Sequence, residues 1–160
     1  MDFRIEPLEL DRRQLATQLL TEAWGAPVIV SRGKLHHVDQ LPGFVAIGDN
    51  NNILGLITYH IDGDACEVVT LNSAVEQVGV GTALLHAAAD AARAEGCRRL
   101  WLITTNDNTP ALRFYQKRGF LLSALYPGSI AEARRLKPQI SLTGIDGIPL
   151  RDEIELAMPL

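Results

Sequence analysis

Long apolar runs are missing from this 160-residue sequence. No run approaches the roughly 18 consecutive apolar residues that mark a membrane-spanning helix. The N-terminal stretch "MDFRIEPLEL" carries acidic residues and a proline, where a secretory signal peptide has a basic and then an apolar region. We therefore expect a cytoplasmic protein with no membrane partner.

Cysteine is also scarce. Cys66 and Cys97 are the two cysteines of the chain, too few for a disulfide framework and without the spacing of a zinc site. The stretch "HIDGD" offers a histidine and two aspartates, but a D-G hairpin turn explains it better than metal ligation. We expect two reduced thiols and no metal.

Basic residues are in the minority. Fifteen Lys and Arg stand against 19 Asp and Glu, which gives a net charge of −4. This balance argues against a protein that wraps nucleic acid and mildly favours a cationic substrate. Hydrophobic residues make up 47% and charged residues 21% of the chain, a composition typical of a globular protein. We expect one domain over residues 1–160, as a monomer or a homodimer.

Hydrophobic periodicity predicts an α/β fold. Three strand-like runs within residues 43–72, separated by the turns "DNNN" and "DGD", predict an antiparallel meander. The segment "VIVSRGKLHHV" remains ambiguous. Other strands are expected at 2–8, 98–105, 120–126 and near the C-terminus, and helices at 11–24, 80–95, 108–118 and 129–137. The order implies a mixed central sheet with an N-terminal meander and flanking helices, whose crossovers make the central strands parallel.

Two glycines mark the change from strand to helix in "EQVGVGTALL", residues 76–85. Glycines at 79 and 81 leave room beside the free N–H groups at a helix N-terminus, where a pyrophosphate can bind. A tight turn that binds nothing is the alternative reading. The Walker pattern is absent, and Leu84 stands where a dinucleotide fingerprint needs a small residue.

Two motifs resemble one family. "EQVGVGTALL" is similar to the pyrophosphate loop [QR]-x-x-G-x-[GA] of the Gcn5-related N-acetyltransferases (GNAT). "NDNTPALRFYQKRGF" resembles the second signature of that family, N-x-x-A-x-x-x-Y-x-x-x-G-F. The residues in register are Asn108, Ala111, Tyr115, Gly119 and Phe120. With the matching element order, the resemblance covers roughly residues 2–126 and extends to the final strand.

The resemblance implies a GNAT fold and acetyl-CoA as cosubstrate. The backbone of Val69 and Leu71 would pair with the pantetheine arm, and Asn108 would contact the coenzyme. Main-chain N–H groups would bind the pyrophosphate at Gln77, Val78, Gly79, Val80, Gly81 and Thr82. Glu76 replaces the usual Gln or Arg and is expected to point to solvent.

The family analogy makes Tyr115 the general acid for the departing thiolate; a packed core aromatic is the alternative. Glu67 is the candidate general base, since alternation places it on the strand face of Val69 and Leu71. A solvent-facing Glu67, with His60 as base, stays open. His36 and His37 receive no role.

The predicted function is N-acetyl transfer to a primary amine, and the alternative is a non-catalytic module that binds coenzyme A or a partner. The acceptor carries no signature in the sequence.

Overall fold

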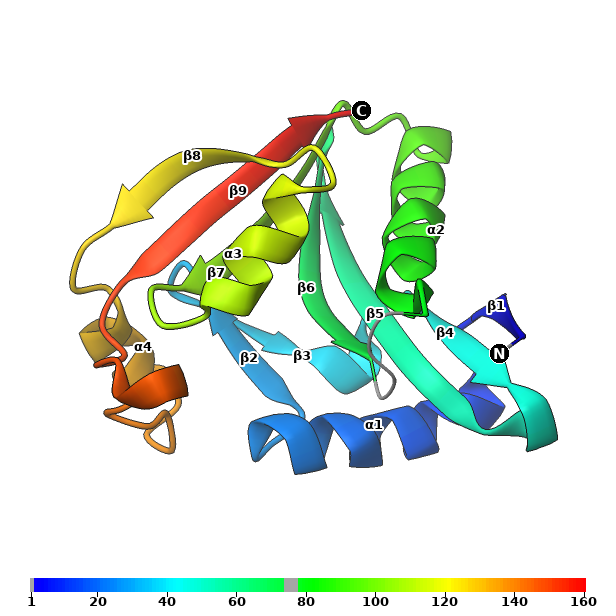
Figure 1. Ribbon diagram of the computed structural model, residues 1–160, viewed down its shortest axis with the longest axis horizontal. Coiled ribbons are helices and arrows are strands. Elements are labelled where there is room, and N and C mark those ends of the chain that lie inside the picture. Colours follow the sequence, from blue (N-terminus) through cyan, green and yellow to red (C-terminus); the bar gives the residue numbers. More distant parts are fainter. Residues whose placement is uncertain (1, 74–77) are drawn as a thin grey trace.

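The computed structural model describes residues 2–73 and 78–160 (Figure 1). Within these residues the chain forms the strands β1 (Phe3–Pro7), β2 (Val28–Ser31), β3 (Lys34–His37), β4 (Gly43–Gly48), β5 (Ile53–Asp62), β6 (Ala65–Ser73), β7 (Arg99–Thr105), β8 (Leu121–Tyr126) and β9 (Glu153–Pro159). The α-helices there are α1 (Leu10–Trp24), α2 (Val80–Ala94), α3 (Thr109–Gln116) and α4 (Ile130–Leu136). The elements expected from periodicity are thus all present, with ends that shift by one or two residues.

The first half of the main sheet is antiparallel, as predicted. Its strands pair in the order β1-β4-β5-β6, and each neighbouring pair is antiparallel. Helices α1 and α2 cover opposite faces of these strands (Figure 1), and a buried apolar cluster fills the space on each side. Leu84 and Ala88 of α2 belong to one cluster, and Ala16 and Leu20 of α1 to the other.

The second half of the sheet mixes directions. Strands β6 and β7 are parallel, as the crossover through α2 requires. Helix α3 connects β7 to β8, but these two strands are not neighbours, because β9 lies between them and runs antiparallel to both. The last strand of the chain therefore sits inside the sheet, and it places residues near 150 beside the end of β7.

The ambiguous segment forms a separate hairpin. Strands β2 and β3 pair through a two-residue turn in which Arg32 has φ 49° and Gly33 φ 76°. Two successive positive φ values define the turn type that suits a tight hairpin. The hairpin carries two buried polar side chains, Ser31 and His36, against the main sheet.

A β-bulge in β6 overturns one expectation. The register with β5 steps from Tyr59↔Val68 to Thr58↔Thr70, so Val69 has no partner of its own. One extra residue reverses the alternation beyond it. Val69 packs with the cluster under α1, whereas Leu71 packs with the cluster under α2. The prediction that Leu71 shares the face of Glu67 is therefore wrong.

Cys66 and Cys97 are both buried free thiols, which confirms that they form no disulfide. Among the described residues, no helix is long and apolar enough to cross a membrane. The same residues contain no group of three or more His, Cys, Asp or Glu side chains that could hold a metal ion.

Candidate active site

Strands β6 and β7 separate partway along their length. Their parallel ladder ends at Val68↔Leu102. Beyond it, β6 continues along β5 as far as Ser73, and β7 continues along β9 as far as Thr105. The divergence is visible in Figure 1, where β7 leans away from β6 toward α3. The separated strands leave a wedge in the sheet, and among the described residues no strand pairs with the β7-facing edge of β6 over residues 69–72.

The glycine turn lies at the N-terminus of α2. Gly79 has φ 83°, which a residue with a Cβ adopts only with strain. Within residues 2–73 and 78–160, no side chain caps this helix end, so its first N–H groups are not occupied by a described side chain. Gln77 was also predicted to bind the pyrophosphate, but it lies outside the described residues. Val78 is at the exposed start of the turn, and the side chain of Val80 points into the core.

Gly81 is crowded by the neighbouring helix α3. Its φ is not positive, but a Cβ at this position would lie 3.2 Å from Cζ of Phe114. The ring of α3 therefore packs directly on the first turn of α2. The positive φ of this turn is at Gly79.

Arg118 adds a positive charge beside this helix end. Its Nε donates to Thr82 Oγ1 over 2.7 Å, and its guanidinium stacks 3.6 Å from the centroid of the Phe114 ring. A cation beside the N–H groups of a helix N-terminus is an arrangement that can bind an anion. The sequence reasoning missed Arg118, although it directly precedes Gly119 of the second motif.

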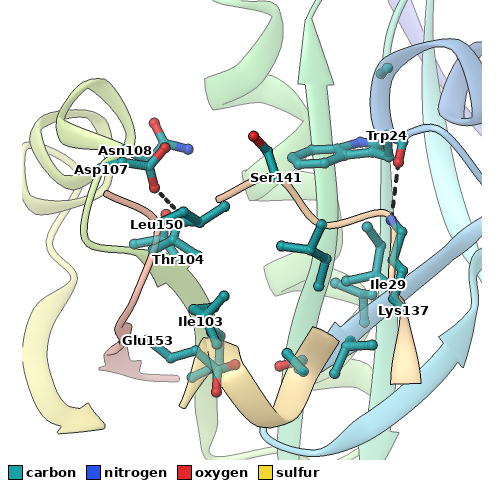
Figure 2. Close-up of a pocket in the computed structure, with 18 of the residues that line it drawn as sticks. Trp24, Ile29, Ile103, Thr104, Asp107, Asn108, Lys137, Ser141, Leu150 and Glu153 are labelled. Carbon is teal, nitrogen blue, oxygen red and sulfur yellow. Dashed lines mark hydrogen bonds between the residues drawn. The ribbon is translucent and has the colours of Figure 1, made fainter. Parts of the chain in front are cut away.

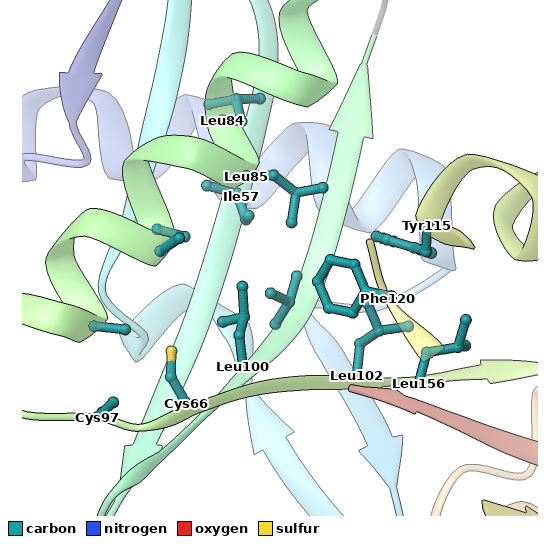
Figure 3. Close-up of a cluster of buried hydrophobic side chains, with 14 of the residues drawn as sticks. Ile57, Cys66, Leu84, Leu85, Cys97, Leu100, Leu102, Tyr115, Phe120 and Leu156 are labelled. Carbon is teal, nitrogen blue, oxygen red and sulfur yellow. The ribbon is translucent and has the colours of Figure 1, made fainter. Parts of the chain in front are cut away.

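Helix α3 holds the two polar residues of the second motif. The Asn108 side chain accepts a hydrogen bond from the N–H of Ala111 and so caps the helix. Tyr115 is 9% exposed and packs edge-on against Phe114 and Phe120. Figure 3 shows it at the end of the buried cluster, beside Phe120. Burial raises the pKa of this phenol, so Tyr115 keeps its proton at neutral pH.

A cavity of about 440 Å³ lies on the other side of the wedge (Figure 2). Its apolar wall includes Trp24, Ile29 and Ile103. Its charged lining consists, among the described residues, of the carboxylates Glu67, Asp107 and Glu153 and the ammonium of Lys137. The end of α1, the hairpin, α4 and the segment 139–150 surround it. Asn108 also lines the cavity, whereas Tyr115 does not.

Glu67 is the carboxylate of this lining that has no arginine or lysine partner and no backbone N–H donor among the described residues. It is 4% exposed, so the alternative of a solvent-facing residue is wrong. Ser31 Oγ donates to its Oε1 over 2.5 Å, and Oε2 lies 3.4 Å from His36 Nε2. Cys66 and Val68, its neighbours on β6, point to the opposite face and share the cluster of Tyr115. Glu67 and Tyr115 therefore lie on opposite faces of the sheet at the wedge.

The other charged groups of the cavity hold its walls together. Glu153 accepts from the backbone N–H of Arg32 and pairs with its guanidinium at 3.3 Å. Asp107 Oδ2 accepts from the N–H of Ile145, and residue 144 must be glycine because a Cβ there would overlap the Asp107 carboxylate.

Lys137 Nζ donates to the carbonyl oxygens of Trp24 and Val28, and burial lowers the pKa of this ammonium. His60, the runner-up base, does not line the cavity.

Comparison with known proteins agrees with this arrangement. The profile of the Acetyltransferase (GNAT) family matches residues 13–120. The chain belongs to the GNAT family of acetyltransferases. Over 142 aligned residues it is 42% identical to the uncharacterised protein YdhI of Bacillus subtilis, and the alignment covers 89% of each chain.

Two further relatives carry descriptive names. A streptothricin acetyltransferase of Streptomyces lavendulae is 35% identical over 97 residues, which span 56% of this chain and 51% of that protein. A GNAT acetyltransferase of Elizabethkingia anophelis, solved with acetyl-CoA bound, superposes with a TM-score of 0.70 at 21% identity and covers 99% of this chain and 98% of its own. The GNAT-like mixed sheet with flanking helices, predicted from the two motifs, is therefore confirmed.

Proposed function

We propose that this protein is an acetyl-CoA-dependent N-acetyltransferase that acetylates a primary amine held in the Glu67 cavity. The observation that carries the proposal is the wedge between β6 and β7. It has an uncapped helix N-terminus on one face of the sheet and a buried, carboxylate-lined cavity on the other. A thioester that enters between the strands would meet an amine that arrives from the opposite side.

The coenzyme face supplies backbone donors and one cation. We assign the pyrophosphate to the N–H groups of residues 78–82, beside Arg118. Val69 and Leu71 offer the unpaired edge of β6 to the amides of the pantetheine arm, in the manner of an added strand. Asn108 uses its side-chain oxygen as the cap of α3, which leaves its NH₂ group for the coenzyme.

The chemistry needs one base and one acid. Glu67 accepts a proton from the ammonium of the acceptor, and the freed lone pair attacks the thioester carbon. When the tetrahedral intermediate collapses, the C–S bond breaks and the phenol of Tyr115 gives its proton to the departing thiolate. The second proton of the attacking nitrogen then returns to the tyrosinate, which leaves a neutral amide and restores the phenol. A neutral phenol is required for proton transfer to the thiolate, and a phenol of ordinary pKa 10.0 is already neutral at neutral pH; burial raises the pKa of Tyr115 further.

The acceptor is an amine with an apolar body. Three carboxylates against one ammonium in the lining favour a cation, and among the described residues neither Glu67 nor Asp107 has a lysine or arginine partner, whereas Glu153 pairs with Arg32. Trp24, Ile29 and Ile103 would contact the hydrocarbon part of the acceptor. Because one relative is named for streptothricin, aminated antibiotics belong among the candidates.

The test is amine-dependent release of free thiol from acetyl-CoA, with the acetylated product identified by mass spectrometry. The panel comprises polyamines, aminoglycosides, streptothricin, amino acids, and peptides with a free N-terminus or lysine. At least one amine should raise thiol release above the hydrolytic background. Tight acetyl-CoA binding without turnover for every class would instead favour a non-catalytic coenzyme-binding module.

A further inference from the structure

His36 presents a buried nitrogen without a partner. The side chain is 3% exposed. Among the buried side-chain N and O atoms of the described residues, His36 Nε2 alone has no hydrogen-bond partner. This nitrogen lies 3.4 Å from Glu67 Oε2, slightly beyond hydrogen-bond distance. Buried polar groups are almost always paired, so an unpaired one directed at a candidate base calls for an explanation.

His36 lies between Glu67 of the cavity lining and the side chain of His60. Glu67 faces it from β6 and His60 from β5, and these two residues are partners in the β5/β6 register. The rings of His36 and His60 meet edge-on with their centroids 5.3 Å apart. His60 Nε2 lies 2.9 Å from the exposed Lys34 Nζ at the start of β3. Among the described residues, Glu67 and His60 are the titratable groups that contact the His36 imidazole, and Lys34 lies behind His60.

A buried carboxylate that takes a proton must lose it before the next turnover. Ser31 cannot accept that proton from Oε1, because its hydroxyl already donates there. The cavity side is filled by the acceptor at this stage. Within the described residues, the imidazole of His36 is the remaining base beside Glu67.

We infer that His36 is a positioning residue that takes the acceptor's proton from Glu67 and passes it toward His60 and solvent. The inference rests on the proposed function. The ammonium gives its proton to Glu67, and the carboxylic acid then gives it to Nε2, which restores the carboxylate and leaves an imidazolium. The imidazolium then loses a ring proton to solvent beside His60; His60 itself is not the acceptor, because its Nε2 lies 2.9 Å from the ammonium of Lys34. Each turnover therefore releases one proton to solvent. This cycle requires that Nε2 of the resting imidazole carry no hydrogen.

Kinetics of His36→Gln test the relay with the best amine from the panel. The turnover number should fall by at least about 10-fold, and KM for acetyl-CoA should stay unchanged. The loss should be smaller than the roughly 10⁴-fold that removal of a direct proton-transfer group can cause. The acidic limb of its pH–rate profile should change shape. His37→Gln, at the exposed neighbouring position of β3, is the matched control and should behave like the parent. A His36→Gln profile that overlays the parent's would overturn the inference.

Nitrogen-15 NMR of the unaltered protein tests the relay without any turnover. At a pH where the ring is neutral, the Nε2 signal of His36 should be that of a nitrogen without hydrogen, and it should shift in Glu67→Gln but not in Asp107→Asn. A hydrogen on Nε2 of the neutral ring would show that His36 only donates to Glu67, and the relay would be refuted. If no amine releases thiol, the proposed function fails, and this spectrum still decides the state of His36.

Discussion

Cζ of Phe114 lies 3.2 Å from the point that a Cβ on Gly81 would occupy. This contact joins α3 to the first turn of α2, where the coenzyme pyrophosphate is proposed to bind. A side chain at residue 81 therefore has two effects, one on the packing of Phe114 and one on the ligand.

Gly81→Val should destabilise the fold by about 1–3 kcal/mol, the usual cost of overpacking. It should also weaken coenzyme A binding by at least about tenfold, or about 1.4 kcal/mol. The double variant Gly81→Val/Phe114→Leu separates the effects, because the smaller side chain relieves the packing and leaves residue 81 facing the phosphate. Calorimetry and chemical denaturation measure both quantities, with Phe114→Leu as the control. Recovery of coenzyme affinity together with stability would place the pyrophosphate elsewhere.

Tyr115→Phe should lower turnover by roughly 10²–10⁴-fold, because the thiolate then leaves without an acid. The ring contacts with Phe114 and Phe120 do not involve the hydroxyl, so the melting temperature and coenzyme binding should change little. Pre-steady-state measurement of thiol release checks this step. A variant with parental turnover would make Tyr115 a packing residue alone.

His60 should make stability depend on pH in mild acid. Burial first, and then the neighbouring Lys34, lower the pKa of this imidazole from its ordinary 6.5. The unfolded chain therefore binds the proton more readily, and the free energy of unfolding should decrease as the pH falls from about 6.5 through the folded-state pKa. Between about pH 7 and about pH 5, the free energy of unfolding measured by denaturation should change less with pH in His60→Gln than in the parent. An equal slope in both proteins would contradict this assignment.

Cys66 should be inert in the native protein. Burial raises the pKa of this thiol to about 12, so almost no thiolate forms at about pH 8. An aromatic disulfide reagent should titrate neither cysteine before denaturant is added, and both afterwards. Rapid reaction of one thiol in native buffer would show that the cluster opens. The same experiment establishes the background for the thiol-release assay.

The two motifs and the hydrophobic periodicity were sufficient to predict the elements and the family, since both are local properties of the chain. Asn108 and Tyr115 fall on α3 at the expected spacing, and the strand-to-helix glycines open α2. The place of β9 in the sheet could not be predicted in this way. β9 lies between β7 and β8, and its pairing with β7 joins two segments that are far apart in the chain.

The acceptor side was harder to predict because its geometry comes from exceptions to local rules. The bulge at Val69 reverses the alternation that linked Glu67 to Leu71. The hairpin that brings His36 to Glu67 turns at Arg32 and Gly33, without the Asn-Gly or Asp-Gly signal of such turns. The contact between His36 and Glu67 joins residues that are far apart in the chain, so the spacing of residues in the sequence could not predict it.

The central claim is that the acceptor amine is deprotonated by Glu67 in the cavity beside the wedge. The most direct test is the pH–rate profile of Glu67→Gln with the best acceptor. The amide oxygen of this variant can still accept the hydrogen bond from Ser31, so the fold should persist. Glu155→Gln, a β9 carboxylate paired with Arg99 outside the cavity, is the control. We predict a loss of roughly 10²–10⁴-fold near neutral pH, with partial recovery at high pH, where the amine loses its proton unaided. A Glu67→Gln profile that coincides with the parent's over the whole range would contradict the account.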